Sequence, residues 1–233
     1  MEFDGRTVIV TGASGHLGRA VAGAFAQRGA RLVLAARSIE ALEARFGAEA
    51  AARAYVAADL TKQAGAEALV RAALDRFGRI DVLCNLAGGF RMGDVHESSD
   101  ETWDFLFDVN ARTMYCASRA VAPHLLAQGS GAIVSVAAAA AQKGTAGMGL
   151  YSASKAVVVR LTEAMSAELR THGINVNCVL PTTLDTPENR SAMPGVDPSR
   201  FVGLPDLAGI IVFLASPAAR PIHGAAIPVT GLG

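Results

Sequence analysis

Two side chains four residues apart could together move a proton. Tyr151 and Lys155 share one face of a predicted helix, because residues at i and i+4 are neighbours on a helix surface. A lysine ammonium near a phenol lowers the phenol pKa from its usual value of about 10, and such a phenol can act as a general acid. The pair predicts proton donation to a substrate, with a surface tyrosine beside a solvated lysine as the structural alternative.

A glycine-containing segment near the start of the chain is suited to binding phosphate. Residues 11–18 read Thr-Gly-Ala-Ser-Gly-His-Leu-Gly, and they connect a predicted strand to a predicted helix. Such a turn brings backbone N–H groups and the positive end of a helix to a pyrophosphate. We expect Gly12 to permit the turn, Gly15 to allow close approach of the phosphate, and Gly18 to let the helix pack on the sheet. The predicted contacts from this turn come from Gly12, Ser14, Gly15, His16, Leu17 and Gly18.

The end of the second predicted strand bears on the choice of dinucleotide. An acidic residue there would bind the ribose hydroxyls of NAD, but this chain has Arg37 followed by Ser38. Arg37 could pair with the 2′-phosphate of NADP, helped by Ser38 and His16. We therefore favour NADP(H) and keep NAD(H) as the alternative. A solvated arginine at the start of a helix would give the same pattern.

Short apolar runs alternate with segments of helical period along the whole chain. The predicted strands are 6–11, 31–36, 54–58, 80–84, 132–136, 174–180 and 225–229. The predicted helices are 17–27, 39–46, 62–77, 100–128, 151–172 and 205–215, with an interruption near Pro123. Strands that are apolar throughout predict a parallel sheet covered on both faces. The expected fold is α/β: one Rossmann domain over 1–233 with a doubly wound, seven-stranded parallel sheet.

Residues 182–203 form the least regular stretch of the sequence and are rich in Pro, Asp and Ser. They follow the sixth predicted strand, at the end of the sheet where such proteins bind ligands. Ordered loops of this length usually have a function. We predict a substrate lid, with an ordinary surface loop as the alternative.

Composition excludes several classes of protein. The 233 residues are 51% hydrophobic, and 21 basic residues balance 21 acidic ones. Zero net charge argues against nucleic acid or a membrane surface as the main partner, and no apolar stretch is long enough to span a bilayer. The scattered Cys84, Cys116 and Cys178 predict buried thiols, with neither a disulfide framework nor a metal site. With no signal peptide pattern, the sequence predicts a soluble cytoplasmic protein.

These motifs resemble those of the short-chain dehydrogenase/reductase family over essentially the whole chain. Small members favour Thr-Gly-x-x-x-Gly-x-Gly, which is matched here except that His16 stands at the usual middle glycine, and they carry Tyr-x-x-x-Lys. The resemblance implies an NAD(P)H-dependent oxidoreductase in which Tyr151 donates the proton. Lys155 would lower the Tyr151 pKa and hold the nicotinamide ribose. Asn110 would bend its helix and carry a water toward Lys155, unless it is a plain polar helix residue.

The resemblance also implies further contacts. For the cofactor these are Asp59, Leu60, Asn85, Ala87, Gly88, Pro181, Leu184 and Thr186. Two of them have structural alternatives, because Asp59 could cap the next helix and Asn85 could tie strands together. Phe90, Met148, Leu150 and Met193 could line the substrate pocket or belong to the core.

One departure from the family pattern affects the chemistry. Thirteen residues before Tyr151, where the family usually has a serine that binds the substrate oxygen, this chain has Ala138; Ser135 lies inside the strand and should not replace it. Quinonoid dihydropteridine reductases resemble this chain in having alanine there, and in residues 82–90 and 138–194. Their acidic residue at the second strand is not matched. The chain therefore predicts reduction of a small carbonyl or of a quinonoid substrate, whose conjugated ring spreads the charge of the added hydride.

Two further expectations concern the whole molecule. A non-catalytic, NADP-binding redox sensor is the alternative function from another class, although Tyr151, Lys155 and Asn110 argue against it. The family resemblance also implies a homo-oligomer, a dimer or tetramer, with helices 100–128 and 151–172 at the dimer face. The predicted partner is otherwise only a small-molecule substrate.

Overall fold

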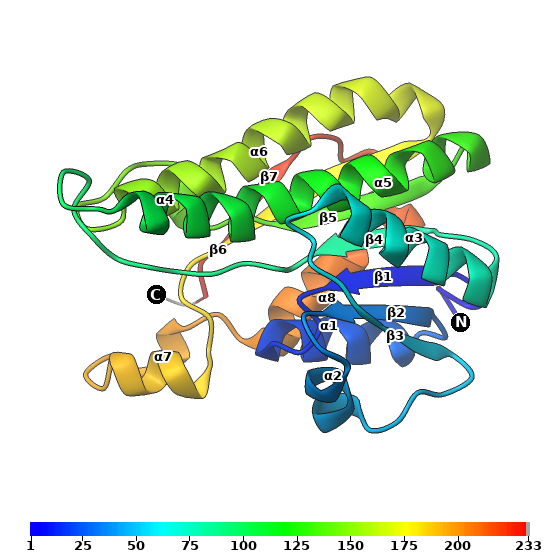
Figure 1. Ribbon diagram of the computed structural model, residues 1–233, viewed down its shortest axis with the longest axis horizontal. Helices are drawn as coiled ribbons and strands as arrows, with labels where there is room; N and C mark the ends of the chain where they lie inside the picture. Colours follow the sequence, from blue (N-terminus) through cyan, green and yellow to red (C-terminus); the bar gives the residue numbers. More distant parts are fainter. Residues whose placement is uncertain (232–233) are drawn as a thin grey trace.

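The computed structural model describes residues 1–231 and contains one parallel sheet of seven strands (Figure 1). The strand order is β3-β2-β1-β4-β5-β6-β7, so the chain builds the sheet outward from β1 and then outward from β4 in the opposite direction. The strands are β1 (Thr7–Thr11), β2 (Arg31–Ala36), β3 (Arg53–Ala57), β4 (Val82–Asn85), β5 (Gly131–Val136), β6 (Ile174–Pro181) and β7 (Ala226–Val229). The predicted doubly wound fold is confirmed, and its switch point lies between β1 and β4, where such sheets bind ligands.

Helices cover both faces of this sheet (Figure 1). One face carries α1 (His16–Ala26), α2 (Ile39–Phe46) and α8 (Leu204–Leu214). The opposite face carries α3 (Gln63–Phe77), α5 (Thr113–Gln128) and α6 (Gly149–Leu169). The short α4 (Asp100–Phe107) precedes α5, and α7 (Pro187–Ala192) stands apart from both helical layers.

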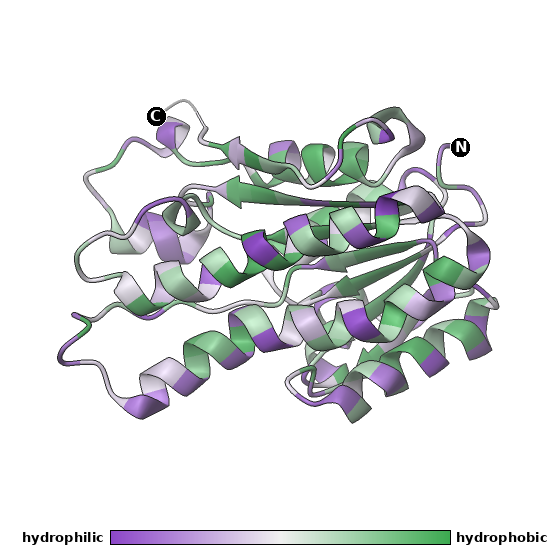
Figure 2. Cartoon of the chain, turned by 90° about the horizontal axis from the view of Figure 1, so that it is seen from above, coloured by the Kyte–Doolittle hydropathy of each residue, from purple (hydrophilic) through white to green (hydrophobic). Residues whose placement is uncertain are grey.

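Strand β1 shows why the central strands are apolar throughout. Val8 and Val10 belong to the core under α1 and α8, whereas Ile9 belongs to the core under α3 and α5. All three side chains are fully buried. Because both faces of a parallel sheet are covered, alternate residues enter two different cores and neither set can be polar. Figure 2 shows the result: the strands are mostly hydrophobic, whereas the helices around the sheet carry both hydrophobic and hydrophilic residues.

The long helix predicted over 100–128 is interrupted at a different place. A π-helical turn at Asp108–Arg112 separates α4 from α5, and there the Thr113 N–H donates to the Asp108 carbonyl five residues earlier. Pro123 lies inside α5 without ending it. A proline removes one backbone donor, whereas the π turn re-aims the side chain of Asn110, as described below. The predicted interruption at Pro123 is therefore wrong.

Three other expectations can be compared with the structure. The irregular segment 182–203 contains a six-residue helix, α7, and a 3₁₀ turn at Pro198–Arg200. The three cysteines are free and buried, as predicted. Within residues 1–231, no helix is both long and apolar enough to cross a bilayer.

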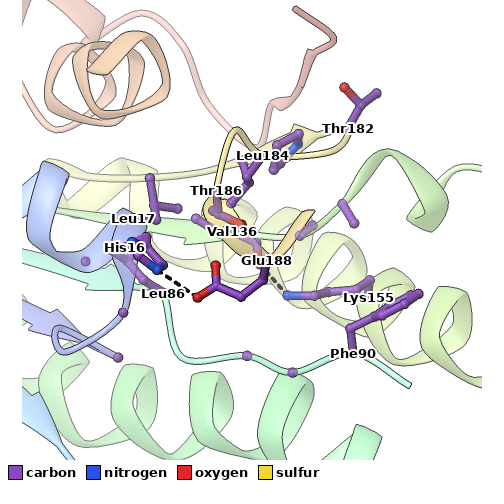
Figure 3. Close-up of a pocket in the computed structure, with 18 of the residues that line it drawn as sticks. His16, Leu17, Leu86, Phe90, Val136, Lys155, Thr182, Leu184, Thr186 and Glu188 are labelled. Atoms are coloured by element: carbon purple, nitrogen blue, oxygen red, sulfur yellow. Dashed lines mark hydrogen bonds and ion pairs between the residues drawn. The ribbon is translucent and has the colours of Figure 1, made fainter. Parts of the chain in front are cut away.

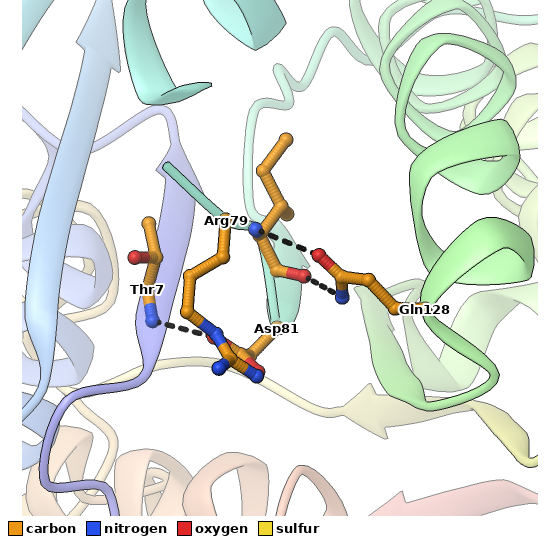
Figure 4. Close-up of polar contacts among 5 residues, drawn as sticks. Thr7, Arg79, Asp81 and Gln128 are labelled. Carbon is orange, nitrogen blue, oxygen red and sulfur yellow. Dashed lines mark hydrogen bonds and ion pairs between the residues drawn. The ribbon is translucent and has the colours of Figure 1, made fainter. Parts of the chain in front are cut away.

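A polar network ties the sheet together at the end opposite the carboxyl ends of the strands (Figure 4). The buried Asp81 carboxylate accepts from the Thr7 N–H at 2.9 Å and from the Arg79 guanidinium at 2.8 and 2.6 Å. The Gln128 side chain bridges to both backbone groups of Ile80. These bonds connect β1, α5 and the segment that enters β4, and Asp81 accepts most of them.

Replacing Asp81 with alanine should lower the free energy of unfolding by about 1–3 kcal/mol, because the Thr7 N–H and the Arg79 guanidinium lose their acceptor. Chemical denaturation of the purified protein measures this change. Asp75→Ala is the matched control, because Asp75 is exposed on α3; that change should stay within about 0.5 kcal/mol. Equal effects of the two substitutions would contradict a central role for Asp81.

Candidate active site

A cavity of about 330 Å³ opens at the carboxyl ends of β1, β4, β5 and β6 (Figure 3). It is the place that the topology predicts for a ligand. The predicted site residues that line it are Gly12, Gly15, His16, Leu17, Gly18, Gly88, Phe90, Tyr151, Lys155, Pro181, Leu184 and Thr186. The fold thus brings the glycine turn, the Tyr–Lys pair and the segment after β6 to one cavity.

The glycine turn has the geometry predicted for it. Gly12 has φ +62°, and a Cβ there would lie 2.9 Å from the Ala87 backbone. A Cβ on Gly18 would lie 2.5 Å from the Gly12 carbonyl, so only glycine lets α1 pack this closely on the turn. Thr11 fastens the turn to the β4 loop, because its hydroxyl accepts from the Leu86 and Ala87 N–H groups at 3.0 and 3.2 Å.

The start of α1 is suited to binding an anion. Its N-cap is Gly15, which has no side chain to bond the first-turn N–H groups, and no acidic residue lies in that first turn. Those N–H groups and the positive helix end therefore face the cavity without an internal cap. The residues present fit the phosphates of a dinucleotide, which would be held by the turn from Gly12 to Gly18.

Tyr151 lies in the first turn of α6, and Phe90 packs edge-on against its ring. The two ring centroids are 4.8 Å apart, and the ring planes are nearly perpendicular at 87°. Burial raises the pKa of Tyr151 above its ordinary value. In the free protein this direction is opposite to the lowering that we expected from Lys155, because desolvation of the phenolate dominates.

Lys155 lies one helical turn after Tyr151 and is almost fully buried. Its Nζ donates to the Val136 carbonyl at 3.0 Å. A Cβ added to Gly88 would lie 3.2 Å from this Nζ, so the ammonium closely approaches the β4 loop. Burial lowers the pKa of Lys155 to about 8, because the charged form is poorly solvated there. A buried cation at this point could bind ribose hydroxyls or stabilise a phenolate.

Asn110 lies in the π turn between α4 and α5, so the helix is distorted where the family resemblance implied a bend. Its side chain is buried and bonds both backbone groups of Gly89, each at 3.0 Å. It also donates to the Ser154 hydroxyl at 3.1 Å. Asn110 therefore connects the β4 loop to α6, and its role in a water relay stays a prediction.

Ala138 lines the cavity and offers no hydroxyl. Ser135, the nearest earlier serine, is completely buried in β5, where its hydroxyl accepts from the Asn85 amide at 3.2 Å. Ser135 therefore cannot take the place of the absent serine. A substrate oxygen in this part of the cavity could therefore bond the phenol of Tyr151. The end of β5 supplies no serine hydroxyl to bond it as well.

Comparison with known proteins gives the family. The model of the short chain dehydrogenase family matches residues 6–196. A sorbitol dehydrogenase from Cereibacter sphaeroides is 34% identical, over 99% of this chain and 98% of that protein. This chain belongs to the short-chain dehydrogenase family.

Other relatives agree with that assignment. A D-threitol dehydrogenase from Mycolicibacterium smegmatis is 35% identical, over 98% of this chain and 93% of its own. Among solved structures, a 3-ketoacyl-(acyl-carrier-protein) reductase from Brucella melitensis, complexed with NADH, has a TM-score of 0.88 and 32% identity, with 97% of each chain covered. The protein is therefore an NAD(P)-dependent oxidoreductase, and its cofactor is a nicotinamide dinucleotide.

Two predicted contacts of this dehydrogenase, Asn85 and Ala87, have structural roles next to the cavity lining. Asn85 is buried and donates to the hydroxyls of Ser118 and Ser135, so it ties β4 to α5 and β5. This is the structural role that the sequence left open. The Ala87 backbone packs so closely against Gly12 that a Cβ on Gly12 would lie 2.9 Å from it. Neither Asn85 nor Ala87 is among the residues that line the cavity.

The predicted adenosine contacts lie outside the cavity, near the ends of β2 and β3. Arg37 is exposed, and Ser38 caps α2 by accepting from the Ala41 N–H at 3.2 Å. The Asp59 carboxylate accepts from the N–H and the hydroxyl of Thr61. These bonds hold the pKa of Asp59 below its ordinary value. The proposed helix cap at Asp59 is wrong, because α3 begins at Gln63 without a side-chain cap. The Leu60 side chain is buried in the core.

Of the predicted substrate residues, only Phe90 is among those that line the cavity. Met148, Leu150 and Met193 are partly buried nearby in the chain but are absent from its lining. Glu188, Thr182, Leu86 and Val136 line the cavity although the sequence did not single them out. Arg45 was also missed: it donates to the Ser14 carbonyl at 3.0 Å and so holds the glycine turn against α2. No local pattern indicated these contacts, because their partners are distant in sequence.

Proposed function

We propose that this dehydrogenase transfers hydride between NADP(H) and the carbon of a small carbonyl or quinonoid substrate, with Tyr151 as the proton donor. The observation that carries this proposal is the shared cavity, which is lined both by Tyr151 and Lys155 and by the phosphate-binding turn that begins at Gly12. The nicotinamide supplies the hydride when it is bound. The chain's own residues would bind the dinucleotide, orient the substrate and move one proton.

Each residue has a distinct task in this proposal. Tyr151 donates its phenolic proton to the substrate oxygen or nitrogen as the hydride arrives. Lys155 binds the ribose and stabilises the phenolate that remains. Asn110 keeps the β4 loop in place through Gly89 and supports proton supply toward Lys155. Pro181, Leu184 and Thr186 would hold the carboxamide of the nicotinamide, and the segment 182–203 would close over the substrate.

Ala138 favours a conjugated acceptor over a simple ketone. A hydrogen-bond donor aimed at a developing oxyanion typically contributes about 2.7–4 kcal/mol to lowering the barrier. A quinonoid ring spreads the incoming charge over several atoms and depends less on one donor. The lack of a hydroxyl at Ala138 therefore supports a quinonoid substrate, such as a quinonoid dihydropterin, as the second candidate.

Restoring the hydroxyl should separate these candidates. Ala138→Ser should raise kcat on simple ketones more than on quinonoid substrates, because only the ketone oxyanion needs a dedicated donor. Steady-state rates on both substrate classes, compared with Ala140→Ser as a control, measure the effect. An equal loss of kcat on both substrate classes would contradict this prediction. It would show that the cavity wall needs a small residue at Ala138 for packing.

We propose NADP(H) as the preferred dinucleotide because Arg37 is exposed at the end of β2, where a carboxylate would select NAD. Arg37→Asp should remove the partner of the 2′-phosphate and add repulsion, and so shift the ratio of kcat/KM values toward NADH. Equal or better use of NADPH by this variant would show that Arg37 does not bind the phosphate. Arg31→Asp is the control, because Arg31 is also exposed on β2 but lies at its opposite end.

One assay tests the proposed function directly. NADPH oxidation is followed at constant dinucleotide concentration with quinones, diketones, simple ketones and a quinonoid dihydropterin. Turnover with at least one of these classes supports a catalytic function, and the class with the highest rate identifies the type of substrate. Tight NADPH binding without turnover on any class would favour a redox sensor instead.

The assembly is also proposed from the family. We propose that a second copy of the chain covers the face formed by α5 and α6. That face carries a groove of about 420 Å³ and the exposed side chains of Tyr115 and Leu126. Sedimentation of the purified protein distinguishes a monomer from a dimer or tetramer.

A further inference from the structure

One contact crosses the mouth of the cavity and joins two segments that are distant in sequence. His16, the first residue of α1, has its Nε2 3.1 Å from the Glu188 carboxylate in the first turn of α7 (Figure 3). Both residues line the cavity. His16 belongs to the phosphate-binding turn, whereas Glu188 belongs to the segment 182–203. This contact therefore connects the turn to the proposed lid.

The charges around this contact favour an ionised carboxylate. The backbone N–H of Glu188 itself, His16 and the Thr186 hydroxyl hold the pKa of the Glu188 carboxyl below its ordinary value. Among the described residues that line the cavity, Glu188 is the only carboxylate, and the cationic groups there are Lys155 and, when protonated, His16. Nearby Arg190 is occupied by Asp185 on the same segment.

Two anions would compete for the same partners at this point. The start of α1 and His16 form the part of the turn that suits a dinucleotide pyrophosphate, and Glu188 now lies against it. A carboxylate and a phosphate next to each other repel, and only one can bond the His16 Nε2. The Glu188 side chain is 71% exposed, so it can swing into solvent without leaving a buried charge unpaired.

We propose that Glu188 is an internal substitute for the cofactor phosphate: it binds His16 in the free protein and is displaced when the dinucleotide binds, which releases α7 from α1. This inference rests on the proposed binding of the pyrophosphate at the glycine turn. It assigns His16 a role as an exchange partner and Glu188 a role in setting cofactor affinity. The apparent affinity for NADPH would then include the cost of breaking the His16–Glu188 contact.

The test measures the dissociation constant of NADPH by its fluorescence, in the absence of substrate. Glu188→Gln should tighten NADPH binding by about 1.4- to fivefold, since exposed ion pairs contribute about 0.2–1 kcal/mol. In a His16→Asn background the same substitution should have a smaller effect, because Glu188 has lost the partner that holds it in place. Adenosine, which lacks phosphates, should bind equally to the wild type and to Glu188→Gln.

A matched control is available in the same chain. His96 and Glu97 form another exposed histidine–carboxylate pair, with 3.7 Å between the His96 Nε2 and the Glu97 Oε1, and neither residue lines the cavity. Glu97→Gln should leave NADPH binding unchanged. Because Glu188 is exposed, its amide variant should keep the unfolding midpoint of the wild type, which a thermal melt checks.

Three outcomes would overturn the inference. Unchanged or weaker NADPH binding in Glu188→Gln would show that the carboxylate does not compete with phosphate. An equal effect in the His16→Asn background would show that His16 is not the exchange partner. Tighter binding of adenosine as well would show a general opening of the site. Failure of the wild type to bind NADPH would instead contradict the proposed cofactor site itself.

Discussion

Tyr151→Phe should lower turnover by about 10²–10⁴-fold while leaving NADPH binding nearly unchanged. The substitution removes only the phenolic oxygen, and it keeps the ring that packs edge-on against Phe90. Phosphates would still bind at the glycine turn, and Lys155 would still bind the ribose. Stopped-flow turnover and NADPH titration on the same preparation separate the loss of chemistry from the loss of binding.

The control for this prediction is Tyr115→Phe. Tyr115 is 46% exposed on α5, in the groove beside α6 and away from the cavity. Loss of the Tyr115 hydroxyl should not change kcat. With a quinonoid substrate the Tyr151→Phe loss should lie at the low end of the range, because the product can take its proton from water. Unchanged turnover across several substrate classes would contradict proton donation by Tyr151 and indicate a site that only aligns the hydride donor and acceptor.

Lys155→Met should lower both turnover and affinity for the cofactor. Lysine is proposed to serve the phenol and the ribose together, so its loss affects binding as well as chemistry. Combined with Tyr151→Phe, the losses in turnover should not add, because both residues act on one proton transfer. Rates and NADPH dissociation constants of the two single variants and the double variant measure this. Additive losses would show that the residues act independently.

The burial of Lys155 also predicts how the free energy of unfolding depends on pH, in an experiment that needs no cofactor. Burial lowers the pKa of Lys155 to about 8 in the folded protein, whereas an unfolded lysine has a pKa of about 10.4. Between these values the unfolded chain binds more protons, so the free energy of unfolding rises with pH. The contribution is fully present above about pH 10.4 and is lost as the pH falls through about 8.

Lys155→Met should therefore flatten the pH dependence of unfolding between about pH 8 and 10. In the wild type, Lys155 should change the free energy of unfolding by about 3 kcal/mol over this interval. Each unit of difference between its folded and unfolded pKa values contributes about 1.36 kcal/mol. Urea denaturation across this range measures it, and Lys143→Met, an exposed lysine in the loop before α6, is the control. An unchanged slope in Lys155→Met would show that the folded protein solvates this ammonium well.

The fold and the cofactor turn could be predicted from the sequence because their determinants are local. A strand that is buried on both faces must be apolar throughout, so β1 is recognisable from Val8, Ile9 and Val10 alone. Gly12 and Gly18 stand where a Cβ would collide with backbone, and glycine is the residue type that such positions require. The i, i+4 spacing likewise places Tyr151 and Lys155 on one face of α6.

Local spacing does not say which way a side chain points, so it could not decide between the two roles predicted for Asn85. Asn85 is the last residue of β4, and its amide donates to the hydroxyls of Ser118 and Ser135; Asn85 is not among the residues that line the cavity. Pro123 carries the strongest local signal for a helix interruption, yet the chain is interrupted at Asn110 instead. There the side chain bonds a loop about twenty residues earlier, and no local propensity encodes that partner.

The electrostatics of the site were decided only by tertiary structure. The composition of α6 does not show that Lys155 would be buried and donate to the Val136 carbonyl, and it is this burial that lowers its pKa. The contact of His16 with Glu188 joins residues separated by 172 positions. Backbone conformation and hydrophobic alternation depend on neighbours in the chain, so the sequence determined them; desolvation and charge pairing depend on neighbours in space, which exist only once the sheet and its helices are assembled.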